Sequence, residues 1–348
     1  MYFQTIQTKF DILQTITIKD IAKALNISTS TVSRALRDSY EINPETKQLV
    51  LEYAEKMNYR PNPIAVSLRE NKSWAIGVIV PEIANHYFSQ AINGIEETAY
   101  RRGYHVMIFQ SNESYEREVA SVGHIVARKV DGLLISISNQ TSEVSHLRAL
   151  NEQGLPIVLF DRVSQDIPTH QVVADNYEGA FKATEHLILS GRKRIAHITS
   201  SPFLSITKER LAGYRAALEQ YGISFEEQLI RYCDTFEVAY IRKYVEELLA
   251  LDCKPDAFFT ASDRLALGCL EALHALEIKI PEEVAMIGFT NIQAAHLLSP
   301  ALSTVVQPAF EMGKVAAELL LDLIENKKRL VEFQTVKLPM EVFIRASS

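Results

Sequence analysis

The feature that most limits the folds open to this chain is a regular alternation of short apolar runs with amphipathic segments after residue 73. Apolar runs separated by helical patterns predict βαβ units, which build parallel sheets that helices cover on both faces. The segment 73–348 is long enough for two such sheets. Seven strands are expected, over Ala75–Val80, His105–Gln110, Gly132–Ser136, Ile157–Phe160, Ile195–Thr199, Ala257–Phe259 and Val284–Gly288.

A different pattern precedes residue 60, where three short helices follow one another with no strand between them. Thr17 and Asp20 have the spacing of a capping box, and Ser28 can cap a second helix after a turn at Asn26. Asn43 followed by proline predicts the start of a third. The residues expected to face inward are Ile18, Ile21, Ala22, Leu25, Val32, Ala35, Leu36, Val50, Tyr53, Ala54 and Met57.

The second of these helices has a polar face that suits DNA. Two short helices joined by a short turn can also form a plain helical hairpin, and the spacing alone leaves that alternative open. Small hydroxyl side chains would let the helix enter the major groove, and an arginine can donate two hydrogen bonds to a guanine edge. Ser28 and Thr31 are placed to bind phosphate, and the groove-facing residues would be Thr29, Ser30, Ser33 and Arg34.

The net charge of −7 is unevenly distributed along the chain. Residues 1–72 hold ten Lys and Arg against eight Asp and Glu, whereas the remainder holds 26 against 35. A mildly basic N-terminal part can approach phosphates, and an acidic body argues against contact with them.

Other patterns exclude several classes of protein. No apolar run approaches the roughly 18 residues of a membrane span, and no signal-peptide pattern is present, so we expect a cytoplasmic protein. Residues 1–16 resemble an extension or tag remnant. The three cysteines, Cys233, Cys253 and Cys269, lack metal-ligand spacing. GxGxxG, GxxxxGK[ST], GxSxG and HExxH are absent, so we expect no cofactor, no metal and no catalytic residues.

The N-terminal module resembles the headpiece of the lactose/galactose/purine repressor family of bacterial transcription regulators. The resemblance rests on TIKDIAKALNISTSTVSRAL at residues 17–36, NPET at 43–46 and NYRPN at 58–62. It implies a helix-turn-helix over residues 17–60 that binds a pseudo-palindromic operator as a homodimer, with Thr17, Ile18 and Asn62 also at the DNA. Arg37 departs from the family pattern, and its role is left open.

Residues 61–72 are expected to form a hinge. Pro61 and Pro63 end the third helix and precede a short apolar run, which could be a simple interdomain linker. In the family, the matching segment becomes a helix on operator DNA and inserts a leucine into the minor groove. By that resemblance Leu68 is the wedge, Ala65 lies against the same groove, and Arg69 approaches phosphate.

Residues 73–348 resemble the family's two-lobed, periplasmic-binding-protein-like sensor. The matching stretches are IGVIVP, KVDGLLI, PIVLFDR, RLAGY, SDRLALG and PEEVAMIGF. We therefore expect an all-α helix-turn-helix headpiece joined to an α/β sensor with parallel sheets. The chain is expected to cross between lobes near residues 171, 302 and 335, so that lobe one covers about 73–171 and 302–335, and lobe two about 172–301 and 336–348.

Ligands of open α/β sheets bind beyond the carboxyl ends of the strands, and several suitable residues follow predicted strands. Asp161 can accept hydroxyl hydrogens, and Arg210, placed at the start of a helix, can clamp a polar group. Some candidates could instead be packing residues or helix caps. Thr290 stands where many relatives have aspartate. The full set of candidate ligand-binding residues is His86, Tyr87, Phe88, Asp161, Arg210, Phe236, Asp263, Thr290 and Gln307.

These patterns favour a repressor whose operator affinity depends on a small polar effector, a sugar or sugar derivative, neutral or acidic. A sugar-binding transport protein without a DNA role is the main alternative, but it should carry a signal peptide and no helix-turn-helix. A family member with a degenerate headpiece is another. An enzyme would need a catalytic constellation that the sequence lacks.

Overall fold

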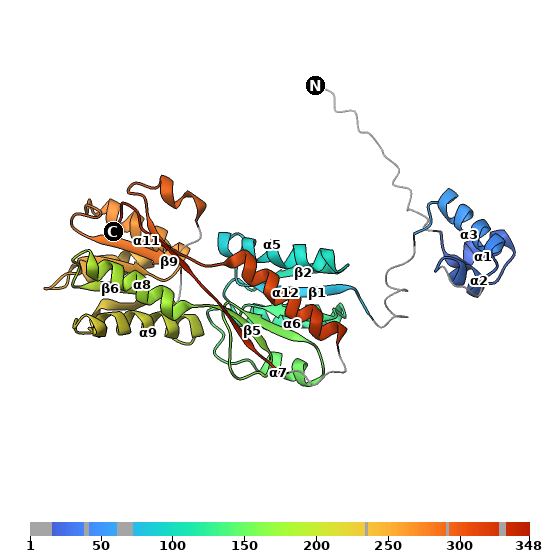
Figure 1. The fold of residues 1–348 in the computed structure, drawn as a ribbon, viewed down its shortest axis with the longest axis horizontal. Coiled ribbons are helices and arrows are strands. Elements are labelled where there is room, and N and C mark those ends of the chain that lie inside the picture. Colours follow the sequence, from blue (N-terminus) through green and yellow to red (C-terminus); the bar gives the residue numbers. More distant parts are fainter. Residues whose placement is uncertain (1–15, 38–41, 61–71, 234–235, 290–291, 327–331) are drawn as a thin grey trace, which may run out of the picture. The chain divides into compact units, whose positions relative to one another are not determined.

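The computed structural model describes residues 16–37, 42–60, 72–233, 236–289, 292–326 and 332–348 (Figure 1). The chain divides into two units, residues 1–72 and 73–348.

The described residues of the first unit form a bundle of three helices, α1 (Ile18–Leu25), α2 (Thr29–Ala35) and α3 (Pro44–Lys56). All three predicted caps are confirmed: Thr17 and Asp20 form the capping box of α1, Ser28 caps α2, and Asn43 caps α3 with proline in its first turn. Asn26 ends α1 in the left-handed conformation, with φ 54°. The small core contains Ile21, Ala22, Val32, Ala35, Val50 and Ala54.

One residue expected in this core lies outside it. Met57 is 39% exposed, because it caps the C-terminus of α3, where the last turn runs out of the bundle. Tyr53 and Tyr59 instead pack against the edge of the core.

The second unit contains two six-stranded sheets. The first has the order β11-β5-β4-β3-β1-β2, and its strands are β1 (Ala75–Val80), β2 (His105–Gln110), β3 (Gly132–Ile135), β4 (Ile157–Phe160), β5 (His170–Ala174) and β11 (Thr335–Leu338). The second has the order β12-β10-β9-β8-β6-β7, with β6 (Ile195–Thr199), β7 (Ile230–Tyr232), β8 (Ala257–Thr260), β9 (Ala285–Phe289), β10 (Ser303–Val306) and β12 (Glu341–Phe343). Only the β10–β12 pairing is antiparallel among the described strands.

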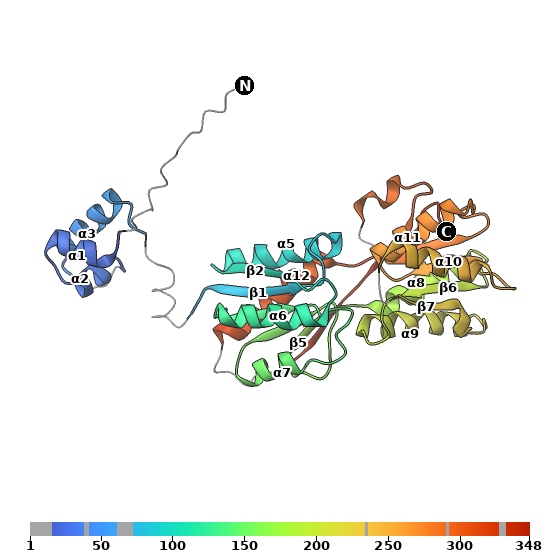
Figure 2. The same cartoon turned by 180° about the vertical axis from the view of Figure 1, so that it is seen from behind.

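Helices cover both faces of each sheet, as Figures 1 and 2 show from opposite sides. The first sheet packs against α5 (His86–Arg101) and α12 (Ala309–Glu325) on one face and α6 (Tyr115–Ala127) and α7 (Ser145–Glu152) on the other. The second packs against α8 (Asn176–Leu189) and α9 (Ser205–Gln220), and against α10 (Val238–Leu249) and α11 (Asp263–Ala275). The remaining helical turns are η1 (Glu227–Leu229) and η2 (Gln293–Leu297).

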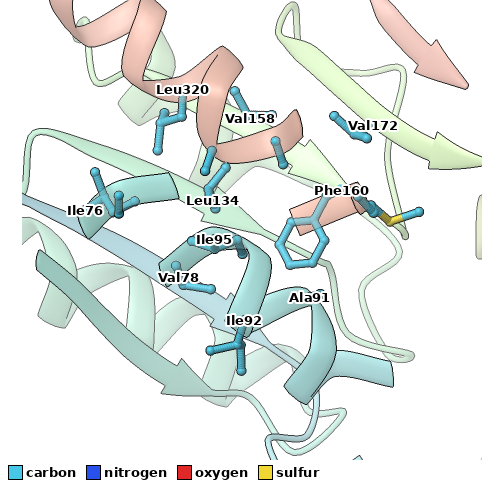
Figure 3. Packing of buried hydrophobic residues seen from close by; sticks show 14 of the residues in the cluster. Ile76, Val78, Ala91, Ile92, Ile95, Leu134, Val158, Phe160, Val172 and Leu320 are labelled. Atoms are coloured by element: carbon cyan, nitrogen blue, oxygen red, sulfur yellow. The ribbon is translucent and has the colours of Figure 1, made fainter. Parts of the chain in front are cut away.

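The first lobe is built on the first sheet, and its core explains why its strands are continuous apolar runs in the sequence. Along β1, Ile76 and Val78 point to the face covered by α5 and α12, while Ala75 and Ile79 point to the face covered by α6. Figure 3 shows Phe160 of β4 in the first of these layers. Burial on both faces is the usual property of parallel sheets.

The helices α5 and α12 approach each other closely because each carries a glycine at the contact. A Cβ atom at Gly94 would meet the carbonyl oxygen of Phe310, and one at Gly313 would meet the carbonyl oxygen of Ala91. Since both neighbours are backbone atoms, no side-chain rotation could relieve either overlap.

The strands place the crossings between lobes a few residues later than the sequence analysis put them. Residues 170–174 and 335–338 pair within the first sheet, and residues 303–306 pair within the second. The crossings therefore follow residues 174, 306 and 338 rather than 171, 302 and 335. The expected positions, given as near residues 171, 302 and 335, precede these strand ends by a few residues because the sequence analysis did not include β5, β10 or β11, which are short and partly polar.

Candidate functional sites

The polar face of α2 carries the predicted DNA-reading residues of the first unit. Ser28, Thr29 and Ser30 are exposed, and the Ser28 hydroxyl accepts a hydrogen bond from the backbone N–H of Thr31 at 3.0 Å. The same hydroxyl lies 2.7 Å from Ser30 Oγ and 2.8 Å from Thr31 Oγ1. Small hydroxyls therefore crowd the start of this helix.

Arginines on α2 and just after it fold back along the helix. Arg34 Nε donates to the carbonyl of Ser30 at 3.4 Å, and Arg37 Nε donates to the carbonyl of Ser33 at 2.9 Å. Arg37 Nη2 also donates to the Ser33 hydroxyl at 3.1 Å. Arg37, whose role the sequence left open, thus orients one of the predicted DNA-reading side chains.

Thr17 and Ile18, the two predicted DNA contacts at the start of α1, stabilise the three-helix unit in this structure. The Thr17 hydroxyl donates to Asp20 Oδ2 at 2.7 Å, and this bond lowers the pKa of the Asp20 carboxyl. Ile18 packs against the bundle core. Asn62, Ala65, Leu68 and Arg69 lie outside the described residues.

In the second unit, three predicted ligand-binding residues come together at the junction of the two lobes. Asp161 directly follows β4 with φ 61°, and its backbone N–H donates to the carbonyl of Val172 at 2.9 Å. Tyr87 lies in the first turn of α5, which Asn85 caps. Arg210 comes from α9 of the second lobe, and its charge acts on Asp161.

Burial governs the ionisation of these groups. It raises the pKa of Asp161 above the ordinary value, and the positive charges of Arg162 and Arg210 offset part of the rise. Burial also lowers the pKa of Arg210 to about 10, against the opposing effect of Asp161. Burial and the Asp161 carboxylate raise the pKa of the Tyr87 hydroxyl well above its ordinary value. The Asp161 carboxylate and the Arg210 guanidinium thus act on each other electrostatically across the junction, and the neutral Tyr87 phenol acts on Asp161 as well.

Arg210 is held in place from several sides. It lies in the middle of α9, not at the start of a helix as expected from the sequence, because α9 begins earlier, at Ser205. Its Nε donates to Asn176 Oδ1 at 2.8 Å, its Nη1 donates to the carbonyl of Ala261, and its guanidinium lies 4.0 Å from the Phe289 ring centroid. With 3% of its surface exposed, its orientation is fixed.

The aromatic pair at the start of α5 packs as well as lining the junction. Tyr87 and Phe88 are about 5% exposed and meet edge to face, with ring centroids 5.1 Å apart. The Tyr87 hydroxyl donates to Met312 Sδ at 2.9 Å. Phe88 therefore belongs to the core of lobe one, whereas the Tyr87 hydroxyl also acts on Asp161.

The other predicted residues are more dispersed. Phe236 is buried beneath Arg264, whose guanidinium lies 5.0 Å from the ring centroid. Asp263 is the first residue of α11, and Ser262 caps that helix. His86 is half-buried at the start of α5, Gln307 is buried after β10, and Thr290 lies outside the described residues.

Sequence reasoning missed a second layer of polar residues at the junction. Arg162 is buried beside Asp161 and forms two hydrogen bonds with Glu113, at 2.6 and 3.0 Å. The Asn139 side chain accepts a hydrogen bond from the backbone N–H of Ser201 in the second lobe at 3.2 Å. The position of Arg162 directly after a predicted ligand residue was the one signal that could have pointed to it.

Unsatisfied hydroxyls mark the same strand ends. The hydroxyls of the described residues that are buried without a hydrogen-bond partner include Ser111 Oγ, Thr199 Oγ1 and Thr260 Oγ1. Each follows or ends a strand, with Ser111 in lobe one and the two threonines in lobe two. Since buried hydroxyls are normally paired, these groups are suited to a polar ligand or to water.

Two further contacts join the lobes at this junction. The Ser205 hydroxyl accepts a hydrogen bond from the backbone N–H of Val163 at 3.3 Å, and Arg264 forms an ion pair with Glu82 at 3.2 Å. Within the described ranges, no group of three or more His, Cys, Asp or Glu could hold a metal ion, and no helix is long and apolar enough to cross a membrane.

Comparison of this chain with known proteins shows which family it belongs to. A family model for "Bacterial regulatory proteins, lacI family" matches residues 17–62, and one for a "Periplasmic binding protein-like domain" matches residues 184–348. Catabolite control protein A of Priestia megaterium is 31% identical over 96% of this chain and 99% of its own length. The chain belongs to the lacI family. The HTH-type transcriptional repressor PurR of Vibrio campbellii, 30% identical over 91% of this chain and 96% of its own, is a further relative.

This lacI-family membership confirms the resemblance and the fold class inferred from the sequence. The solved structure of the transcriptional regulator CelR with cellobiose covers 96% of this chain and 100% of its own, with a TM-score of 0.72 and 27% identity. The relatives named here are transcription regulators rather than enzymes. The protein is a DNA-binding transcriptional repressor of the lacI family, and the three-helix unit is its helix-turn-helix rather than a plain helical hairpin.

Proposed function

We propose that this repressor binds a pseudo-palindromic operator as a cytoplasmic homodimer and that a small sugar-like effector at the lobe junction controls its operator affinity. The observation that supports an effector site is a set of buried, unpaired hydroxyls at strand ends of both lobes, near which Asp161 of one lobe and Arg210 of the other act on each other electrostatically. A dimer would present two copies of α2 to two half-sites related by the same twofold axis.

The charges at the junction favour a neutral effector. The three arginines described there are balanced by three carboxylates: Arg162 forms an ion pair with Glu113 and Arg264 with Glu82, while the Asp161 charge acts on both Arg162 and Arg210. His197, near Arg210, adds no charge, because burial lowers its pKa to about 4. An acidic or phosphorylated sugar would therefore meet no uncompensated cation among these residues. We accordingly propose a neutral polyhydroxylated ligand over an acidic one.

Hydroxyl-rich ligands also match the donors and acceptors at the site. Ser111, Thr199 and Thr260 each have one donor and two acceptor positions, and a carboxylate accepts hydroxyl hydrogens. The solved CelR structure is a complex with cellobiose, a neutral sugar, in a protein of the same architecture. This supports a sugar without identifying the one that this chain binds.

Calorimetry tests the proposal directly. The protein should be titrated with neutral pentoses, hexoses and disaccharides, and in parallel with sugar acids, sugar phosphates and nucleobases. We expect binding by at least one neutral sugar and loss of that binding in Arg210→Ala. Heat only from acids or phosphates would contradict the charge argument, and no binding across the panel would contradict the sensor assignment. The alternative, a sugar-binding protein without a DNA role, would bind the sugar but no operator.

A further inference from the structure

The turn between β2 and α6 contains two adjacent residues in an unusual backbone conformation. Asn112 and Glu113 both have left-handed backbones, with φ of 51° and 61°. Asparagine tolerates this region, but glutamate rarely adopts it. Strain of this kind persists where the surroundings hold a residue firmly, and it clusters at functional sites. The contacts of Glu113 therefore need an explanation.

The Glu113 carboxylate binds two neighbouring loops of the same lobe. Its Oε2 accepts hydrogen bonds from Arg162 Nη1 at 2.6 Å and from the backbone N–H of Asn139 at 2.8 Å. Its Oε1 accepts from Arg162 Nη2 at 3.0 Å. The loops after β2, β3 and β4 thus meet at one carboxylate, and both terminal nitrogens of the guanidinium are occupied.

Without this carboxylate, Arg162 would be a buried cation at the junction that could bind an anion. Its guanidinium lies 5.8 Å from the Phe88 ring centroid, and its Nε lies 3.9 Å from Asp161 Oδ2. A planar guanidinium with two free terminal nitrogens binds carboxylate and phosphate in a bidentate manner. With Glu113 in that position, both terminal nitrogens are occupied, and only Nε, which is buried without a hydrogen-bond partner, remains for a ligand.

We propose that Glu113 determines the charge selectivity of the effector site, because its carboxylate occupies the Arg162 guanidinium and thereby excludes anionic ligands. The inference rests on the proposed function, since it places the effector beside Asp161. It makes Glu113 a positioning residue that acts through Arg162. Removing the Glu113 carboxylate should free the Arg162 guanidinium to bind a small carboxylate from solution.

Chemical replacement of the missing carboxylate by acetate tests this proposal without knowledge of the natural effector. Glu113→Gly removes the carboxylate and suits the left-handed backbone. The side chain of Glu113 is 19% exposed, so acetate can reach the space it leaves. We expect a saturable rise in the thermal midpoint of the full-length variant, by about 2 °C once acetate exceeds its Kd roughly five-fold, at constant ionic strength.

Two controls make the result specific to Arg162. The double variant Glu113→Gly with Arg162→Met should lose the acetate response. Glu82→Ala removes a carboxylate from Arg264 at the same junction, but that pair is 33% and 44% exposed, so solvent screens the remaining cation and no response is expected. Glu113→Asn, which also tolerates the left-handed backbone, serves as a second variant if the glycine variant does not fold.

The outcomes separate this inference from the proposed function. An acetate response confined to the Glu113 variants supports the charge-selective role of Glu113. Equal behaviour of the variants and the unaltered protein, or a response that survives Arg162→Met, would overturn it. Failure of the sugar panel would instead count against the effector assignment and leave the acetate result to stand on its own.

Discussion

Removal of Arg210 offers the most informative perturbation of the lobe junction. Arg210 is 3% exposed, donates hydrogen bonds to Asn176 and Ala261, and lies over the Phe289 ring. Arg210→Ala leaves the buried Asp161 without its cation from lobe two. It also leaves two buried acceptors, Asn176 Oδ1 and the Ala261 carbonyl, without their donor, and each unsatisfied buried polar group costs about 1–3 kcal/mol. For a unit of this size, a combined loss of about 2–6 kcal/mol lowers the thermal midpoint by roughly 4–24 °C.

A double-mutant cycle separates the charge from the lost packing. Asp161→Asn removes the charge for which Arg210→Ala leaves only Arg162 as a cation, so the double variant should lose less stability than the sum of the two single variants. We expect a coupling energy of about 1–3 kcal/mol, measured by urea unfolding followed by circular dichroism. Additive effects, with coupling below about 0.5 kcal/mol, would refute the pairing across the junction.

The pH dependence of the stability of the same variants gives an independent test of the interaction between Asp161 and Arg210. Because burial raises the folded pKa of Asp161 above its unfolded value, the stability it contributes is present below the unfolded pKa and is lost as pH rises through the folded pKa. Arg210 offsets part of this rise, so Arg210→Ala should lose more stability than the unaltered protein between acidic and neutral pH. Asp161→Asn in the same background should remove that difference.

Three further predictions concern other parts of the chain. Arg34→Ala should cost about 1–3 kcal/mol of operator binding and relax base preference at one position per half-site, measured by binding to a library of single-base operator variants. Leu68→Ala, outside the described residues, should weaken specific binding by about a few kcal/mol and leave nonspecific binding nearly unchanged, since less stacking surface enters the minor groove. Gly313→Ala should destabilise the sensor by about 1–3 kcal/mol or more in urea unfolding, because its Cβ would overlap the backbone of Ala91. Full operator discrimination by either DNA variant, or a stable alanine variant at 313, would contradict the corresponding assignment.

Local signals in the sequence were sufficient to predict the helix caps and the long apolar strands. The capping box of Thr17 and Asp20 and the Asn43 cap need only neighbours a few residues away. The strands that were missed are short and partly polar, and pairing with distant strands stabilises them, as for β11 beside β5. Their omission shifted every expected crossing between lobes.

The candidate site shows the same difference between residues with a local sequence signal and residues that only the fold brings together. The position of Asp161 at the lobe junction was predictable, because it follows an apolar strand at the edge where parallel sheets bind ligands. Glu113 was not, because its partners Asn139 and Arg162 lie 26 and 49 residues away, and only the fold brings them together. A glutamate in a polar turn otherwise resembles any solvated side chain.

Operator affinity measured with and without a bound sugar tests the central claim most directly. Fluorescence anisotropy of an operator duplex, selected from random sequences with the full-length protein, gives the dissociation constant at fixed salt. With a saturating neutral sugar identified by calorimetry, we predict a change of about 5- to 150-fold, and no change in Arg210→Ala. An operator affinity that stays constant while the sugar binds to the protein would contradict an effector-controlled repressor.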